Sequence, residues 1–199
     1  MIWSPAVTGE LHGTSLGGDL ELVPYDPAWP ARFVALRDKL ALALGPVALR
    51  IDHIGSTAVP SLAAKAVIDI QVIVSNQADD ASYMPGLEST GLGLRYRDPA
   101  ASWSFFRPMR PPRTHHVHVT SAGSPRERAQ LLFVDYLRYD AGARDAYAAL
   151  KYELAATHAN DRVAYTDAKT EFVTAVLEDA EAWAATTGWQ VPRATRADT

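Results

Sequence analysis

Hydrophobic positions that recur every three or four residues predict helices, and alternating hydrophobic positions predict strands, along most of the chain. A helix is expected from Asp26, which can cap it with Pro27 in its first position, to the stop at Gly45-Pro46. Residues 66–74 predict the strongest strand, which is apolar on both faces, as a strand with neighbours on both edges would be. Further strands are expected at 20–24, 47–54, 92–97, 102–107 and 115–120, and a weaker helix at 79–90.

The last third of the chain predicts helices only. Ser124-Pro125-Arg126-Glu127 is a capping box that opens a helix to about Tyr139. Two more helices are expected at 143–158 and 166–186, with Gly188 as a C-terminal stop. Residues 1–18 predict a flexible arm, 189–199 a frayed tail, and 19–188 one domain. The whole pattern favours an α+β fold, a mixed β-sheet flanked by helices with a three-helix C-terminal layer.

Composition narrows the function classes. The 199 residues contain no cysteine, which excludes disulfide frameworks, thiol nucleophiles, Cys-ligated zinc and iron–sulfur clusters. The net charge of −4 argues against a non-specific nucleic-acid binder, so no nucleic-acid partner is expected. No apolar run approaches the roughly 18 residues of a membrane span, and no signal peptide is visible, so the expected location is the cytoplasm, away from membranes. The sequence contains no P-loop, HExxH, dinucleotide-binding or EF-hand motif. It also gives no indication of an oligomeric state.

Polar residues on predicted strands are the first candidates for chemistry. Asp69 interrupts an apolar strand, which is costly unless the acid is satisfied by local donors or binds a metal. His116 and His118 share one strand face, where they can hold one metal ion or phosphate, or be a structural pair. His53, on another strand, is a third candidate metal ligand. If these strands are neighbours, the four residues and Gln71 line one patch of the sheet.

Phosphate-binding candidates surround this patch in the sequence. Gly55-Ser56 follows a strand and can offer backbone N–H groups and a hydroxyl to a phosphate, although most such pairs are simple turns. Basic residues could frame an anionic ligand, but a helical lysine or arginine more often belongs to a solvated face. These basic residues are Lys65, Arg107, Arg110, Arg113, Arg138, Lys151 and Lys169.

A family resemblance covers about residues 20–185. The run from His53-Ile54-Gly55-Ser56-Thr57 through Lys65 to Asp69-Ile70-Gln71-Val72 resembles the signature of the GrpB family, apart from Ser61 and Ala66 in place of its usual Gly and Pro. Further matches are Tyr25-Asp26-Pro27-x-Trp29, His116-Val117-His118-Val119, Asp135-Tyr136-Leu137-Arg138, Tyr147-x-x-Leu150-Lys151 and Tyr165-x-x-x-Lys169. The resemblance implies the nucleotidyltransferase fold more firmly than it implies a reaction. The family also occurs fused to dephospho-CoA kinases.

The superfamily motif implied by this resemblance is only partly present. Gly55-Ser56 matches its first part and Asp69 its first acid, but Gln71 replaces the second acid, and His116 or His118 stands where a third could fall. The resemblance implies a divalent metal, Mg²⁺ or Mn²⁺, with Asp69, His53, His116 and His118 as candidate ligands. One acid, an amide and neutral imidazoles suit Mn²⁺, Zn²⁺ or Ni²⁺ better than Mg²⁺. An anion bound by histidine and arginine without a metal is the alternative.

Three functions follow. The leading hypothesis is a nucleotidyltransferase-like enzyme that transfers a nucleotidyl group from an NTP to a small-molecule acceptor, with Asp69, His116 and His118 as catalytic residues. The substrate phosphates would be bound by Gly55, Ser56, Thr57, Lys65, Arg107, Arg138, Lys151 and Lys169. The alternatives are a non-catalytic module that binds a nucleotide or CoA-like ligand, and a His-centred transferase or hydrolase that does not use an NTP.

Overall fold

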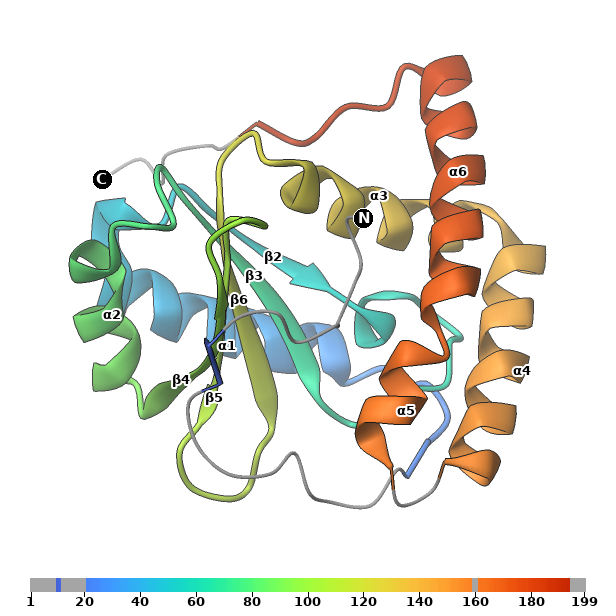
Figure 1. Cartoon of the computed structure of the whole chain (residues 1–199), viewed down its shortest axis with the longest axis horizontal. Coiled ribbons are helices and arrows are strands. Elements are labelled where there is room, and N and C mark those ends of the chain that lie inside the picture. Colours follow the sequence, from blue (N-terminus) through green and yellow to red (C-terminus); the bar gives the residue numbers. More distant parts are fainter. Residues whose placement is uncertain (1–9, 12–20, 159–160, 194–199) are drawn as a thin grey trace.

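The computed structural model describes residues 10–11, 21–158 and 161–193, which form a six-stranded sheet with helices on both of its faces (Figure 1). The strands are β1 (Glu10–Leu11), β2 (Arg50–Ile54), β3 (Ile68–Val74), β4 (Leu92–Asp98), β5 (Trp103–Pro108) and β6 (His115–Ser121). The helices are α1 (Trp29–Leu44), α2 (Asp80–Ser89), α3 (Pro125–Tyr139), α4 (Ala141–Thr157), α5 (Arg162–Asp167) and α6 (Thr170–Thr187), with short 3-10 turns η1 (Gly45–Val47) and η2 (Ser56–Ala58).

The sheet order is β1-β4-β5-β6-β3-β2, and only the β3–β6 pair is parallel. β3 therefore lies between two strands, as its apolar pattern predicts. In the β3–β6 pair, Asp69 lies opposite His116 and Gln71 opposite His118. Residues that are direct partners across a ladder share a face, so this register places the four polar side chains on one face of the sheet.

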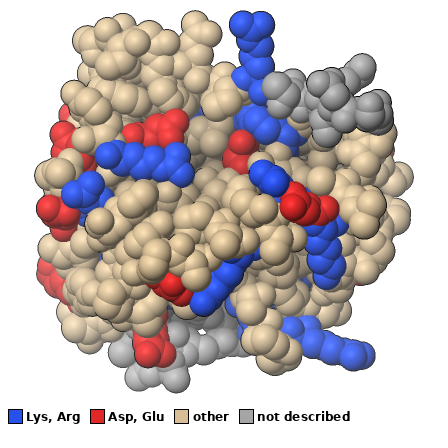
Figure 2. Space-filling model, turned by 180° about the vertical axis from the view of Figure 1, so that it is seen from behind, with Lys and Arg blue, Asp and Glu red and all other residues tan. Residues whose placement is uncertain are grey.

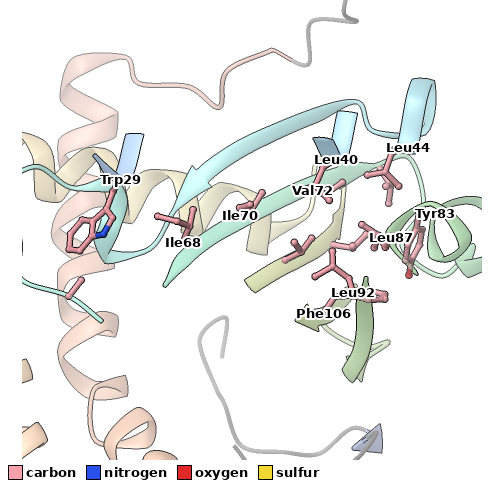
Figure 3. Packing of buried hydrophobic residues seen from close by; sticks show 14 residues of the cluster. Trp29, Leu40, Leu44, Ile68, Ile70, Val72, Tyr83, Leu87, Leu92 and Phe106 are labelled. Atoms are coloured by element: carbon pink, nitrogen blue, oxygen red, sulfur yellow. The ribbon is translucent and has the colours of Figure 1, made fainter. Parts of the chain in front are cut away.

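The opposite face of the sheet carries the main core. Ile68, Ile70 and Val72 of β3 pack there with buried residues of α1, α2 and neighbouring strands (Figure 3). Trp29 at the start of α1 and Tyr83 of α2 are fully buried in this cluster. Burial of each such side chain stabilises the fold by about 1.5–3 kcal/mol, so α1 and α2 fix the back of the sheet.

Helix α3 covers the polar face at the β2 end. Ser124 caps it by accepting a hydrogen bond from the Glu127 backbone N–H, and Glu127 also bonds to Arg50 of β2 at 2.6 Å. Arg50 in turn donates a hydrogen bond from Nε to the Asp52 carboxylate. Burial raises the pKa of Asp52, although the nearby Arg50 opposes this effect. Helices α4, α5 and α6 gather on one side of the molecule, beside η2 and away from α2 (Figure 1).

The α+β class and most predicted elements are confirmed, with boundary shifts of a few residues. The first helix begins at Trp29 rather than Pro27, because the Asp26 carboxylate accepts from the Ala28 N–H and Asp26 O from Trp29 N–H. The expected strand 20–24 is reduced to a single bridge between Val23 and Ala64. Pro24 has no N–H with which to extend that ladder.

The C-terminal layer has four helices in the described residues, not three. The helix expected at 166–186 corresponds to α6, which begins only at Thr170, and α5 is an additional short helix that ends at Asp167, before the turn at Ala168 and Lys169. Gly188 ends α6 with φ +72°, as predicted. Most of the expected N-terminal arm and the end of the tail lie outside the described residues, while Glu10–Leu11 pair with β4.

Among the described residues, no helix is both long and apolar enough to cross a membrane. On the face seen from behind, Lys and Arg side chains lie beside Asp and Glu side chains rather than in one patch of a single sign (Figure 2).

Candidate functional site

The centre of the site is the Asp69 carboxylate of β3. It is held by the imidazoles of His116 and His118, which both lie on the adjacent parallel strand β6. His116 Nδ1 lies 3.0 Å from Asp69 Oδ1, and His118 Nε2 lies 3.6 Å from the same oxygen. Burial raises the pKa of the Asp69 carboxyl, but the hydrogen bonds from His116 and His118 outweigh burial, so its pKa is lowered. Asp69 is therefore an ionised acceptor, and His116 Nδ1 donates to it. In a neutral His116 ring that donates from Nδ1, the lone pair is on Nε2, where it can act as a base.

Aromatic side chains of β5 pack against both histidines. The Trp103 indole N–H donates to His118 Nδ1 at 3.1 Å, and the two rings are nearly parallel at 9°. Phe105 lies edge-on to His116, with ring centroids 5.1 Å apart. Sequence reasoning missed both residues. Their alternation in the predicted strand 102–107 was a usable signal, but it becomes informative only once β5 is known to pair with β6.

Gly55 allows the η2 turn to approach Asp69 closely. Its backbone has φ +69° and ψ −172°, a region open almost only to glycine. A Cβ at this position would lie 2.6 Å from Asp69 Oδ2. The Gly55-Ser56 turn therefore lies directly beside the carboxylate.

Three lysines converge near this turn. Lys151 of α4 is only 2% exposed, and its ammonium bonds to Ser56 Oγ at 3.2 Å and to the Ala63 carbonyl. The ammonium groups of Lys65 and Lys169 both lie over the Tyr165 ring, 4.9 and 4.5 Å from its centroid. The break between α5 and α6 places Tyr165 and Lys169 in this arrangement.

These lysines repel one another. Burial and the charges of Lys169 and Lys65 lower the pKa of Lys151 to about 7. Burial and Lys65 lower the pKa of Lys169 to about 8, against the opposing effect of Asp69. Of the described charges that shift these two pKa values, only Asp69 is negative. An anionic ligand would therefore relieve unfavourable charge in the folded protein.

Comparisons with known proteins identify the family of the chain. The sequence profile of the family described as "GrpB protein" matches residues 19–179. The chain belongs to the GrpB family. The UPF0157 protein BH1888 of Halalkalibacterium halodurans is 36% identical over 186 residues, covering 90% of this chain and 94% of that protein. The dephospho-CoA kinase of Mycolicibacterium paratuberculosis is 33% identical over 95% of this chain but only 54% of its own length.

A solved structure shows the same fold. The crystal structure of the conserved protein GrpB from Enterococcus faecalis superimposes with a TM-score of 0.74 at 30% identity, covering 82% of this chain and 99% of that one. The GrpB match spans all the strands from β2 to β6 and both Lys151 and Lys169. The family resemblance predicted from the sequence is therefore confirmed.

His53 does not join the patch in this GrpB chain. It lies opposite Ile70 in the β2–β3 ladder and so faces α1, where it stacks on Phe33 with ring centroids 4.7 Å apart. Its Nε2 lies 3.0 Å from the Thr57 hydroxyl. The expectation that His53 is a metal ligand beside Asp69 is therefore wrong. Successive residues of a strand point to opposite faces of the sheet, and His53 pairs with Ile70, the neighbour of Asp69.

Other predicted phosphate ligands have different partners. Arg138 donates from Nε and Nη2 to the Ala58 carbonyl and from Nη1 to Asp135, so it braces the η2 turn. The buried Thr57 hydroxyl donates to the Val67 carbonyl. Arg107 is buried on β5, on the face of Phe105, whereas Arg110 and Arg113 lie in the β5–β6 loop.

The donor set does not fit the divalent metal that the family resemblance implies. The described residues include no group of three His, Asp or Glu that could hold a metal ion. Gln71 occupies the second-acid position and is fully buried. Its amide makes no hydrogen bond within the described residues, although it lies near enough to Asp52 to lower that pKa. Asp69 is engaged by two imidazoles, and the described part of the chain does not group it with a second carboxylate that could neutralise Mg²⁺.

Proposed function

We propose that this GrpB protein binds the phosphates of a nucleoside triphosphate and transfers the nucleotidyl group to a small-molecule acceptor. The observation that supports this proposal is the convergence of Lys65, Lys151 and Lys169 beside Ser56 and the Asp69–His116 pair. Three ammonium groups match the charge of a polyphosphate, and preorganised cations stabilise the charge that develops in phosphoryl-group chemistry.

The chemical step uses groups of this chain. Asp69 accepts the Nδ1–H of His116 and so orients its ring, and His116 Nε2 takes the proton of an acceptor hydroxyl. The acceptor oxygen then bonds to the α-phosphorus, and the bond to the leaving pyrophosphate breaks with its electron pair. The lysines stabilise the negative charge on that leaving group. Because the donors do not fit a metal ion, no step is assigned to one.

A binding module without turnover is the second candidate. Gln71 in place of the second acid favours it, because nucleotidyl transfer by two metals needs carboxylates at that position. Relatives named dephospho-CoA kinase contain a domain like this one, which makes CoA and its precursors reasonable ligands for such a module.

Ligand binding is tested first by thermal unfolding. ATP, CTP, GTP, UTP, CoA and pyrophosphate are each added with EDTA or with Mg²⁺ or Mn²⁺. A ligand at about 100 times its Kd stabilises the fold by about 2.7 kcal/mol, which raises Tm by about 5–10 °C in a chain of this size. Lys169→Met is expected to remove the Tm shift. Lys39→Met is the control and keeps it, because Lys39 lies near the far end of α1, where it donates to the Thr90 carbonyl.

Turnover then separates the two candidates. With α-labelled NTP and a mixture of small-molecule acceptors, His116→Asn lowers product formation by about 10²–10⁴-fold while it leaves the ligand-induced Tm shift in place. A Tm shift without product from the wild type supports the binding module. The absence of a Tm shift with every phosphorylated ligand overturns both.

A further inference from the structure

Trp103 determines where His118 carries its proton. The indole N–H is a donor only, and it points at His118 Nδ1 at 3.1 Å, so Nδ1 must present its lone pair. A neutral imidazole has one N–H, which is therefore on Nε2, the atom that lies 3.6 Å from Asp69 Oδ1.

Asp69, His116 and His118 form no metal-binding group as they stand, yet two of the distances between their polar atoms are close to those between metal ligands. Ligand atoms about 2.0–2.2 Å from a tetrahedral ion stand about 3.3–3.6 Å apart. The distance from Asp69 Oδ1 to His118 Nε2, 3.6 Å, lies at the upper end of that range, and the distance to His116 Nδ1, 3.0 Å, lies below it. A metal needs a lone pair on each ligand nitrogen, and both nitrogens facing Asp69 carry hydrogen instead.

We propose that Trp103 is a positioning residue that closes this site to divalent metals by fixing His118 as the Nε2–H tautomer. The indole is itself held in place. The Arg126 guanidinium lies 3.8 Å from the centroid of the Trp103 ring, and the centroid of the Tyr96 ring lies 5.0 Å from it. The Asp69 carboxylate thus faces N–H groups of both His116 and His118, and it accepts the hydrogen bond from His116 Nδ1. This inference does not depend on which ligand the lysines bind.

The tautomer is measured directly in the wild type by ¹⁵N NMR of the imidazole rings. His118 Nδ1 gives the chemical shift of an unprotonated nitrogen, and His118 Nε2 that of a protonated one. In Trp103→Phe, which keeps an aromatic ring but has no N–H, the two shifts move toward each other or exchange. A wild-type His118 protonated on Nδ1 overturns the proposal without any variant.

Metal affinity is the second readout. Zn²⁺ is titrated by calorimetry into the wild type, Trp103→Phe and the double variant Trp103→Phe/Asp69→Asn. Trp103→Phe gains a binding step that the double variant loses, and the wild type shows no step that depends on Asp69. Trp189→Phe is the matched control, because it removes an indole N–H that donates to Asp135, away from the histidines. A wild-type Zn²⁺ step abolished by Asp69→Asn, or no gain in a folded Trp103→Phe, overturns the proposal.

Discussion

Gly55 and Asp69 are in direct contact, so that a β-carbon on Gly55 would lie 2.6 Å from Oδ2 of the carboxylate. The turn that carries Ser56 and the acid that accepts a hydrogen bond from His116 are therefore parts of one packed unit. A change in either residue displaces the other. This coupling makes the glycine a test of the whole site.

Gly55→Ala is expected to lower both stability and ligand binding. The φ of +69° costs an alanine about 1–3 kcal/mol, which lowers Tm by about 2–12 °C, and the contact pushes Asp69 away from His116. Gly91→Ala is the control, because Gly91 also has a positive φ of +89° but nothing within 4 Å of its Cβ position. Calorimetry and ligand-induced Tm shifts distinguish the two variants. Equal binding by both would contradict the coupling.

The lysines predict a pH dependence of stability. An unfolded lysine has a pKa near 10.5, and Lys151 and Lys169 have pKa values of about 7 and 8 in the folded protein. Between about pH 7 and pH 10.5 the unfolded chain binds more protons, so these two groups make the free energy of unfolding rise with pH. Below pH 7 both states are protonated, and the folded protein bears the full cost of the buried charge.

Lys151→Met is expected to flatten that rise. Urea unfolding at several pH values between 6.5 and 10 gives the slope for the wild type and for the variant. Lys39→Met, on the exposed side of α1, keeps the wild-type slope. If the Lys151→Met and wild-type profiles run parallel, Lys151 does not carry the buried charge assigned to it.

Arg138→Lys is expected to lower stability more than it alters the electrostatics of ligand binding. Lysine keeps the charge but cannot make the paired bonds from Nε and Nη2 to the Ala58 carbonyl. Loss of bonds from a charged donor costs about 1.5–3 kcal/mol. Denaturant unfolding measures this loss, and the salt dependence of ligand binding stays that of the wild type. Weaker ligand binding without a loss of stability would instead make Arg138 a phosphate ligand, because lysine cannot pair two N–H groups with one phosphate.

Glu127→Gln is expected to destabilise the fold strongly. The Glu127 carboxylate joins Arg50, at 2.6 Å, to the start of α3, and both side chains are largely buried. Removing one charge of a buried ion pair costs about 3–5 kcal/mol. Arg128→Gln breaks the Arg128–Glu181 pair, whose side chains are 37% and 52% exposed, and should change stability by less than about 1 kcal/mol. Chemical denaturation compares the two variants, and similar losses would contradict the burial argument.

Local pattern predicted the strands that hold Asp69 and His116 but not their adjacency. The two residues are 47 positions apart, and nothing in either strand specifies a parallel partner. The same limitation explains the correction at His53, whose face depends on the β2–β3 register. Lys151 and Lys169 look like ordinary helical lysines in the sequence. Only the packing of α4 and α6 against the η2 turn makes them buried and mutually repelling.

β6 follows β5 in the chain, yet it pairs with β3 on its other edge. A nascent chain in which β6 has not yet been synthesised can form the antiparallel β2–β3 and β4–β5 pairs. Each pair then exposes a strand edge that has no partner. Both edges close only when the last strand arrives, and the Asp69–His116 contact forms in the same event. Such non-local pairing is slow. A chain shortened before residue 115 is therefore expected to lack the site and to aggregate rather than to retain partial function.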